Sequence, residues 1–449
     1  MIAAARKIRM GFVGGGEGAF IAQAHRQAAG LDGRFELVCG AFSRDAQNNQ
    51  RSGAALGLPA QRCYDSWQDM LAAESMLSPD QRMELLVIVT PNHLHAPVAS
   101  AALSAGFHVF SEKPAALNLA EVQALERVVS RSQRIYALAH TYLGYAMVWQ
   151  AREMVASGVI GRLRKVLVEY PQGWLSTDVA GQGNKQADWR DNPEQSGIGG
   201  CIGDIGTHAF SLAEFIAGQP IQFISAMLGS HFSSRQLDDD AAMLFKMADG
   251  ASGVLIASQV CAGEENPLKI RLYGDKGGLE WRQEEPASLI HRPLNEPLRV
   301  LRSGLGQAWL CEAATRRMRL PAGHPEGYLE AMANLYGDLA QAILAGTSGP
   351  DAPGVPGLAT GLRGMAFIET AIANHRGDAK WSEIPRHSIG ASAHENWSNT
   401  PWRHARPGHL SRAIHLGRSA LRLPRQHCTM GGLARLQGHP VADPWHALH

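Results

Sequence analysis

The chain has 449 residues, 45% hydrophobic and 18% charged, enough to bury the cores of two domains. Its 42 basic and 41 acidic side chains balance, so no basic excess indicates nucleic acid or an anionic membrane as a partner. The six cysteines show neither CxxC nor Cys/His metal spacing, which fits a reducing cytosol and no metal site. No signal peptide is recognisable, and no apolar run approaches the ~20 residues of a membrane span. We predict a soluble cytoplasmic protein.

Residues 1–142 alternate between short apolar runs and segments of helical periodicity. Strands are predicted at 8–13, 35–42, 84–90 and 108–111, and helices at 17–29, 95–105 and 119–132. The strand ELLVIVT has almost no polar interruption, as expected of a parallel sheet that is buried on both faces. The alternation predicts an α/β fold, a Rossmann dinucleotide-binding domain.

The pattern changes after about residue 160, where short strands follow one another with few helices between them. Strands are predicted at 163–169, 221–228, 241–247, 253–259, 268–273 and 278–281, and helices at 207–217, 326–344 and 359–374. This succession predicts a second, α+β domain over residues 143–384, with a mostly antiparallel open sheet.

Residues 385–449 differ from both domains. They hold nine of the 19 histidines and eight arginines, but no lysine and only two acids. Their apolar residues lack periodicity, which predicts a poorly ordered extension, and the irregular histidine spacing does not favour a metal site. Arginine without lysine also suggests a shifted reading frame or an unusual terminal fusion.

The first strand ends in GGGEGA, before a predicted helix. Gly14 and Gly16 let the backbone turn tightly and approach a pyrophosphate, which the amides of the helix N-terminus would face. Glu17 belongs to the same candidate cofactor turn. A glycine cluster can also be an ordinary flexible turn, but its place between a strand and a helix favours a dinucleotide site.

The second strand ends in AFSRD. An NAD site often has a carboxylate there for the ribose 2′-hydroxyl, and an NADP site often has an arginine for the 2′-phosphate. Ser43 and Arg44 occupy this position and lean slightly towards NADP, with Asp45 just beyond. A merely solvated Arg44 is nearly as consistent with the sequence, so NAD and NADP both stay open.

The third strand ends in VTPNHLH. Ligands of open α/β sheets lie beyond the carboxyl ends of the strands, so Thr90, Pro91, Asn92 and His95 are candidate cofactor contacts. Asn92 or His95 could instead cap the following helix.

Lys113 follows the next strand, in GFHVFSEKPAA. Lysines are usually solvated, but one placed directly after a buried strand and before a proline is expected to point into the cleft. Its ammonium could stabilise the alkoxide that forms when hydride leaves carbon.

The stretch GIGGCIGDIGTHAF places Asp204 and His208 four residues apart, on one face if the helix starts at or just before them. Oxidation of an alcohol needs a base for the hydroxyl proton, and histidine titrates near the working pH. A lone histidine beside glycines would more often be structural, but the nearby Asp204 favours catalysis.

The sequence resembles the Gfo/Idh/MocA oxidoreductases, the family of glucose–fructose oxidoreductase and inositol dehydrogenase. The resemblance rests on the glycine turn, VTPNHLHAPVASAALSAGFHVFSEKP, GGCIGDIGTH and LYGDKGGLEW, in this order, and spans residues 8–384. It implies a Rossmann domain followed by a substrate domain whose open sheet often forms an oligomer interface, and hence a homo-oligomer. Ala19 departs from the third glycine of the usual turn.

The resemblance also implies roles for particular residues. Lys113, Asp204 and His208 match the family's catalytic set, and Glu112 would contact the nicotinamide ribose. The stretches ADWRDNPEQSG and GHPEGYLEA resemble a branch that acts on free sugars or inositols. That branch implies three further residues in the substrate pocket, which are Tyr142, Arg190 and His324.

We therefore predict an NAD(P)-dependent dehydrogenase of a secondary alcohol on a sugar or cyclitol. His208 would accept the proton, Lys113 would stabilise the oxyanion, and Asp204 would fix the substrate ring. Two alternatives stay open: an NAD-dependent glycoside hydrolase that acts by transient oxidation, and a catalytically silent dinucleotide sensor. The presence of all three catalytic residues argues against the sensor.

Overall fold

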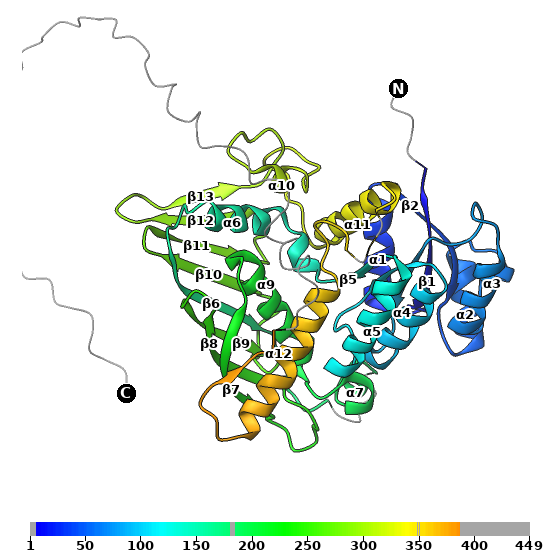
Figure 1. The fold of residues 1–449 in the computed structure, drawn as a ribbon, viewed down its shortest axis with the longest axis horizontal. Coiled ribbons are helices and arrows are strands. Elements are labelled where there is room, and N and C mark those ends of the chain that lie inside the picture. Colours follow the sequence, from blue (N-terminus) through cyan, green and yellow to red (C-terminus); the bar gives the residue numbers. More distant parts are fainter. Residues whose placement is uncertain (1–5, 180–184, 348, 350, 387–449) are drawn as a thin grey trace, which may run out of the picture. The chain divides into compact units, whose positions relative to one another are not determined.

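The structure is a computed structural model that describes residues 6–179, 185–347, 349 and 351–386. Two sheets organise them: a five-stranded sheet in the order β2-β1-β3-β4-β5, and a nine-stranded sheet in the order β13-β12-β11-β10-β6-β9-β8-β7-β14 (Figure 1). The predicted Rossmann fold and the second domain with a mostly antiparallel sheet are confirmed. The extension predicted from residue 385 lies outside the described residues from 387 onward.

The first sheet is entirely parallel. Its strands are β1 (Ile8–Gly14), β2 (Phe35–Ala41), β3 (Leu85–Val89), β4 (His108–Ser111) and β5 (Tyr136–Leu138). The connecting helices are α1 (Phe20–Leu31), α2 (Ala46–Ala55), α3 (Trp67–Met76), α4 (His95–Ser104) and α5 (Leu119–Ser132). All five residues of β3 are buried, which explains its uninterrupted apolar sequence.

A late helix, α11 (Tyr328–Leu344), packs against α1 and joins one core of the first sheet. The Tyr336 ring lies edge-on to Phe35 and Phe110, with centroids 5.2 and 4.9 Å apart. The Rossmann core therefore includes residues that follow β13 of the second sheet in sequence. The linear boundaries near residues 142 and 384 stay a prediction.

The second sheet is antiparallel except between β6 and β9, which run parallel. Its strands are β6 (Leu163–Pro171), β7 (Ile221–Gly229), β8 (Asp240–Met247), β9 (Ser252–Ser258), β10 (Lys269–Gly274), β11 (Gly277–Arg282), β12 (Ser288–Pro293), β13 (Arg299–Arg302) and β14 (Ser382–Glu383). The helices that pack on one face of it are α6 (Ala146–Ala156), α9 (Thr207–Ala217) and α12 (Leu358–Arg376) (Figure 1). Three short helices complete the fold: α7 (Lys185–Arg190), α8 (Pro193–Ser196) and α10 (Glu312–Thr315).

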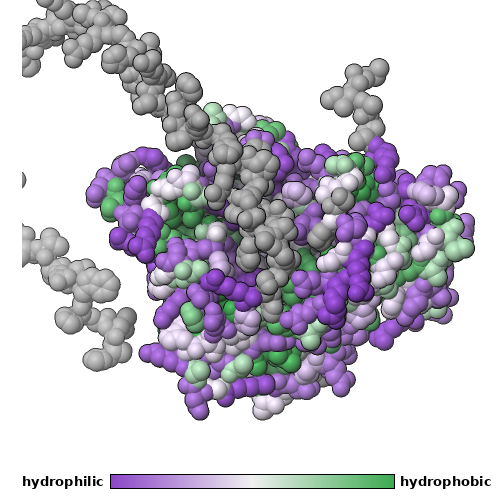
Figure 2. Space-filling model, viewed as in Figure 1, coloured by the Kyte–Doolittle hydropathy of each residue, from purple (hydrophilic) through white to green (hydrophobic). Residues whose placement is uncertain are grey.

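The opposite face of this sheet carries exposed apolar side chains. Met227, Leu244, Ile256 and Val300 are 61%, 51%, 38% and 49% exposed, and Met227 and Ile256 both pair with Ala242 of β8. Figure 2 shows hydrophobic residues among hydrophilic ones over the strands at the β12–β13 end. Exposed apolar surface on a sheet often marks a protein interface.

Most predicted elements lie where the sequence placed them, with one shifted boundary near the glycine turn. The helix predicted from residue 17 begins at Phe20, because Gly18 has a φ of +87° and Ala19 is extended. Several elements that are short or weakly amphipathic were not predicted, and the omitted elements are α2, α3, α6, α7, α8, α10, β5, β12, β13 and β14. Among the described residues, no helix combines the length and apolar character that crossing a membrane requires.

Candidate active site

A cavity of about 590 Å³ lies where the carboxyl ends of the first sheet meet the second domain. Thr90, Asn92, Glu112 and Lys113 line it from the Rossmann side, each beyond the end of a parallel strand. The residues that line it from the other side include Tyr142, Tyr170, Gln172, Arg190, Asp204, His208, Asn266, Gln283 and Tyr328. The predicted catalytic residues are thus brought to one cavity.

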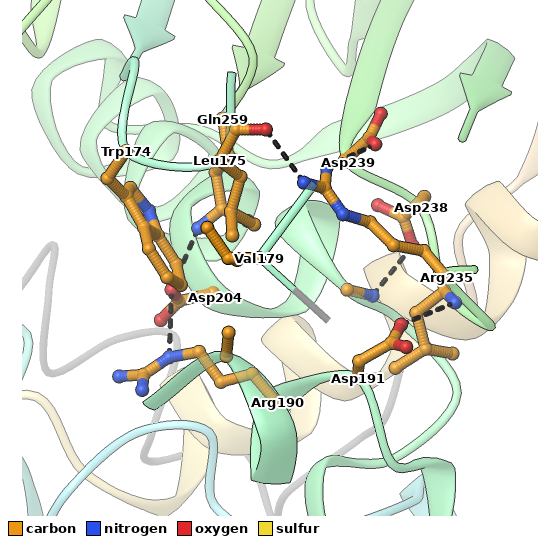
Figure 3. A pocket seen from close by; sticks show the side chains of 13 residues that line it. Trp174, Leu175, Val179, Arg190, Asp191, Asp204, Arg235, Asp238, Asp239 and Gln259 are labelled. Atoms are coloured by element: carbon orange, nitrogen blue, oxygen red, sulfur yellow. Dashed lines mark hydrogen bonds and ion pairs between the residues drawn. The ribbon is translucent and has the colours of Figure 1, made fainter. Parts of the chain in front are cut away.

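Lys113 and Asp204 join the two sides. The Lys113 Nζ donates to Oδ1 and to the backbone oxygen of Asp204, both at 2.7 Å. The other carboxylate oxygen, Oδ2, accepts from Gln259 at 3.0 Å and lies 3.3 Å from Nε of Arg190. Figure 3 shows the Arg190 side chain pointing towards the Asp204 carboxylate. Asp204 is therefore held at both oxygens.

The charges around Asp204 keep it ionised. Burial opposes ionisation, but the nearby Lys113 and Arg190 cations and the Lys113 hydrogen bond outweigh this effect and hold the pKa of Asp204 well below its ordinary value. The carboxylate therefore stays charged at neutral pH and can accept hydrogen bonds from substrate hydroxyls.

His208 lies beside this pair in a mostly aromatic wall. Its ring is edge-on to Tyr142 and His140, with centroids 4.8 and 5.4 Å apart. Burial lowers the pKa of His208 well below its ordinary value, and the positive charge of Lys113 adds to the effect. The same two causes lower the pKa of His140 to about 4. His208 is therefore a neutral imidazole at neutral pH, able to accept a proton.

The segment that carries Asp204 and His208 is not a regular α-helix. A π-helical turn (Ile202–Gly206) contains Asp204 and continues into α9, which contains His208. The two side chains do lie near each other, but the wider turn, and not the 3.6-residue α-helical period, sets their spacing. Such π-turns are often found at functional sites.

Asp238, which the sequence did not single out, holds the start of this helical segment. Its Oδ1 accepts from the Gly200 amide at 2.7 Å, its Oδ2 from Ile202 at 2.8 Å, and its backbone oxygen from Cys201 at 2.7 Å. These amides belong to a helix N-terminus, where the N–H groups have no acceptor within the helix. An oxygen acceptor completes their hydrogen bonding, and a negative charge stabilises this end of the helix. Asp238 thereby fixes the turn that aims Asp204.

A smaller cavity of about 200 Å³ adjoins the first and shares Arg190, Gly200 and Asp204 with it (Figure 3). Its charged groups are bonded within the protein: Arg235 pairs with Asp239 at 2.6 Å and donates to the Leu175 and Thr177 carbonyls. The residues that line this cavity therefore support the active site and offer few free groups to a ligand.

A hydroxyl-rich wall faces His208. The Tyr142 and Tyr170 hydroxyls lie 2.5 Å apart, and Tyr170 donates to Oδ1 of Asn266 at 2.6 Å. Gln172 donates to the same Asn266 oxygen at 2.8 Å, while the Asn266 amide donates to Tyr142 at 3.2 Å. These groups can exchange hydrogen bonds with the hydroxyls of a polyol.

The glycine turn has the geometry of a phosphate cradle. A Cβ at Gly14 would meet the Val89 carbonyl oxygen at 2.7 Å, and one at Gly15 would meet Cβ of Ala22 at 2.3 Å. A Cβ at Gly16 would lie 2.5 Å from Oδ1 of Asn48. No side chain caps the N-terminus of α1, which begins just after the turn. The turn and helix therefore fit the pyrophosphate of a dinucleotide.

Of the residues after β3, some could contact a ligand and others are hydrogen-bonded within the protein. Thr90 lines the cavity, and its hydroxyl is buried without a hydrogen-bond partner among the described residues, as a hydroxyl awaiting a ligand would be. His95 also lines it, but its ring nitrogens contact the Pro114 and Thr90 carbonyls at 2.7 and 2.9 Å, which favours a scaffold role. Pro91 is not among the lining residues.

The capping alternative for these residues is wrong. The Asn92 side chain donates to the Ser196 carbonyl at 2.9 Å, and α4, which starts at His95, has no side-chain cap. Asn92 instead connects the Rossmann side to α8.

At the end of β2, Arg44 is the residue that could contact the adenosine half of a cofactor. The Asp45 carboxylate accepts from the Asn48 amide at 2.6 Å and so caps α2, while Ser43 accepts from the Asp45 amide. Arg44 is exposed. Glu17 is 66% exposed and pairs with Arg51, so its side chain faces solvent beside the turn.

Two of the three substrate residues implied by the resemblance lie in the cavity, and one does not. Tyr142 and Arg190 line it. His324 lies on an exposed turn, its Nδ1 3.3 Å from the Pro321 carbonyl, so this structure does not support its predicted role. Gly323, with a φ of +91°, turns this loop at the surface.

Several cavity residues escaped the sequence analysis. Gln172 and Gln259 follow the parallel strands β6 and β9 directly, so the strand-end rule could have found them. No comparable local signal marks Asn266 or Tyr328, which reach the cavity from a turn and a helix start, or His140, whose ring lies beside His208.

Known protein families match both parts of the chain. Residues 8–140 match an oxidoreductase family with an NAD-binding Rossmann fold, GFO_IDH_MocA, and residues 148–280 match the GFO/IDH/MocA C-terminal domain. An uncharacterized oxidoreductase of Bacillus subtilis, YfiI, is 31% identical over 388 residues, covering 84% of this chain and 97% of that protein.

Two relatives have more specific names. The crystal structure of an inositol dehydrogenase homolog from Azotobacter vinelandii, complexed with NADH and myo-inositol, is 32% identical and has a TM-score of 0.76. The match covers 84% of this chain and 98% of the Azotobacter vinelandii chain. The levoglucosan dehydrogenase of Pseudarthrobacter phenanthrenivorans is 24% identical over 425 residues, covering 85% of this chain and 99% of that protein.

Proposed function

Because the chain belongs to the Gfo/Idh/MocA family of oxidoreductases, we propose that it transfers a hydride between a nicotinamide cofactor and a secondary alcohol of a sugar or cyclitol. Its first domain is an NAD-binding Rossmann fold. Relatives that bind myo-inositol or are named for levoglucosan support the substrate class, and so does the hydroxyl-rich wall of the cavity.

One observation carries this proposal: an ammonium of the first domain and an aspartate of the second meet at 2.7 Å, with a neutral imidazole beside them. A carbinol needs these three groups: a cation for its developing oxyanion, an acceptor for its proton, and an anion for a neighbouring hydroxyl. Lys113, His208 and Asp204 supply them in that order.

A bound nicotinamide would supply the hydride acceptor for oxidation of a CH–OH group to C=O, and the hydroxyl proton would pass to the protein. His208 accepts that proton, while Lys113 stabilises the negative charge that develops on oxygen. Asp204, held by Gln259 and Lys113, accepts a hydrogen bond from a neighbouring hydroxyl and fixes the ring. Bound cofactor and substrate would displace water from the cavity, which would strengthen each electrostatic interaction.

The cofactor site follows from the same residues. The glycine turn and the start of α1 would hold the pyrophosphate, Thr90 would meet the nicotinamide half, and Glu112 would accept from its ribose. We propose NAD as the working cofactor because the matched family is described as NAD-binding and the inositol dehydrogenase homolog binds NADH. The exposed Arg44 could contact the 2′-phosphate of NADP.

A substrate screen tests the proposal. Purified protein is incubated with inositols, aldoses and anhydrosugars, with NAD⁺ and NADP⁺ separately, and reduced nicotinamide is followed by absorbance. Turnover of at least one polyol is expected. Cleavage of aryl glycosides without added cofactor and without net reduction would indicate the hydrolase alternative, and absence of both reactions would contradict an enzymatic role.

Replacement of the proposed base tests the mechanism. His208→Gln should lower kcat by about 10²-fold or more, since a positioned acid–base group contributes that much. NADH affinity should stay near that of wild type. The exposed His231, changed to Gln, is the control and should keep full activity; wild-type turnover in His208→Gln would refute the assignment.

We also propose that the apolar outer face of the second sheet forms a homo-oligomer interface. The cytoplasmic location remains a prediction from cysteine usage.

A further inference from the structure

A buried hydrogen-bonded chain runs behind the proposed cofactor site. The Tyr336 hydroxyl of α11 lies 2.8 Å from Nδ1 of His25 on α1, and Nε2 of His25 lies 2.9 Å from Oε1 of Glu112 after β4. His25 is 0% exposed and Tyr336 is 1% exposed. Three elements that are distant in sequence therefore meet at one imidazole.

Hydrogen-bond chemistry sets the direction of this chain. An ionised Glu112 can only accept, so Nε2 of His25 donates to it. With that one N–H on the ring, Nδ1 is an acceptor, and the Tyr336 hydroxyl donates to it. Each bond has one donor and one acceptor, so the relay is fully satisfied with a single tautomer of His25.

Aromatic packing fixes the ring in this position. The His25 ring is edge-on to Phe110 and Tyr336, with centroids 5.5 and 5.8 Å apart. The imidazole therefore cannot turn away without breaking buried packing and both hydrogen bonds.

Glu112 is the end of the relay that meets the cavity. It lines the cavity, and its second oxygen, Oε2, accepts from the Lys113 amide at 3.2 Å. Burial alone would raise its pKa, but the hydrogen bond from His25, with a smaller effect of the Lys113 charge, brings the pKa below its ordinary value. His25 is thus the main partner that keeps this buried carboxyl an acceptor.

We propose that His25, fixed by Tyr336, is a positioning residue that holds the Glu112 carboxylate ready to accept a hydrogen bond from the nicotinamide-side ribose of the cofactor. This inference rests on the proposed function. It gives α1 two tasks: its N-terminus faces the pyrophosphate, and His25, five residues later, orients the group for the second ribose. One helix would thus contribute to cofactor binding twice, directly at the pyrophosphate and through Glu112 at the ribose.

Binding of two nucleotides to the full-length chain tests the proposal. NADH contains the nicotinamide-side ribose and ADP does not. His25→Leu should weaken NADH binding by about 10- to 100-fold, the range for a hydrogen bond to a charged group. ADP binding should stay within about twofold, because its contacts lie at the glycine turn. Isothermal titration calorimetry measures both dissociation constants.

Three further variants sharpen the test. His25→Gln keeps an N–H donor and should recover most of the NADH affinity, whereas Tyr336→Phe removes one oxygen and should cost a few-fold. The matched control is His108→Leu, another buried histidine, whose Nδ1 accepts from the Ile135 amide away from the cavity. It should leave the ratio of NADH to ADP affinity unchanged.

The outcomes separate three cases. Equal weakening of NADH and ADP, or unchanged NADH binding in His25→Leu, would overturn the positioning role while leaving the proposed function intact. If His25→Leu does not fold, unchanged NADH affinity in Tyr336→Phe would overturn it. Failure of the wild-type chain to bind NADH would remove the proposed function and this inference together.

Discussion

The two sides of the active site are held in place by different means. On the Rossmann side, Thr90 and Lys113 follow strands of a parallel sheet, whose carboxyl ends share one edge. On the other side, Asp204 and His208 lie on a helical segment whose first turn is fixed by Asp238, a residue from the loop before β8. Topology positions the first set, and tertiary hydrogen bonds position the second.

This difference predicts how each side responds to mutation. A residue at the end of a buried strand keeps its backbone position when its side chain changes, so a substitution removes the chemistry and contacts of that side chain and leaves the strand in place. The position of a residue on the helical segment that Asp238 caps depends on hydrogen bonds from outside that segment. Its function can therefore be lost through a mutation elsewhere in the chain. Substitutions on the two sides test this contrast.

Lys113→Met should have the largest effect, a fall in kcat of about 10³-fold, because one oxyanion-stabilising group contributes that much. Methionine keeps the length of the side chain, and the buried strand before it should keep the fold. Steady-state kinetics with the best substrate measures the loss.

The control for Lys113→Met is Lys165→Met on β6, whose ammonium lies 3.4 Å from the Ser252 hydroxyl and not in the cavity. It should retain full activity. A Lys113→Met enzyme with more than about a tenth of wild-type kcat would contradict the oxyanion role, since tenfold is only about 1.4 kcal/mol.

The Rossmann side was largely predictable from sequence for the same topological reason. Apolar runs locate the strands, and the polar residues after them, Thr90 and Lys113, then fall at the sheet edge. The aspartate and histidine of the second side were found by their spacing, although a π-turn replaces the expected α-helix.

The remaining site residues could not be predicted because their roles depend on contacts across long stretches of chain. Asn266 bonds Tyr142, 124 residues away, and His25 bonds Tyr336, 311 residues away. The resemblance alone suggested His324, and the exposed turn that carries it leaves it outside the cavity.

Asp238→Ala should lower kcat about tenfold without touching the cavity's catalytic groups, because the first turn of the Asp204 segment would lose its cap. Loss of a helix cap also costs about 1–2 kcal/mol of unfolding free energy. Urea denaturation and steady-state kinetics measure the two effects separately.

A cap on the first domain provides the matched control. Ser66 caps α3 by accepting from the Asp69 amide at 3.0 Å, so Ser66→Ala should cost similar stability but no activity. Equal kcat values in the two variants would contradict the positioning role of Asp238 and leave it a purely structural cap.

Acid should destabilise the protein through buried neutral histidines. Burial lowers the pKa of His108 and His140 from 6.5 to about 4. Between these values the unfolded chain binds protons that the folded chain does not. The unfolding free energy should therefore fall by up to about 1.4 kcal/mol per pH unit for each histidine as pH drops from 6.5 to 4.

Single variants separate the two histidines in this experiment. His108→Gln and His140→Gln should each flatten the slope of unfolding free energy against pH, measured by urea denaturation between pH 7 and 5. Only His140→Gln, next to His208, should also change the pH profile of kcat. An unchanged slope in both variants would show that these histidines do not titrate as their burial requires.

The smallest effect is expected at the adenosine end of the Rossmann side. Arg44 is exposed at the end of β2, while the neighbouring Asp45 carboxylate caps α2 and is not free to bind a ribose. Arg44→Ala should raise the KM for NADP⁺ a few-fold, because a 2′-phosphate would lose a cation, and should leave the KM for NAD⁺ nearly unchanged. Substrate KM should not move, since Arg44 is outside the cavity. If both cofactors weakened equally, Arg44 would support the fold of the β2–α2 turn and would not discriminate between them.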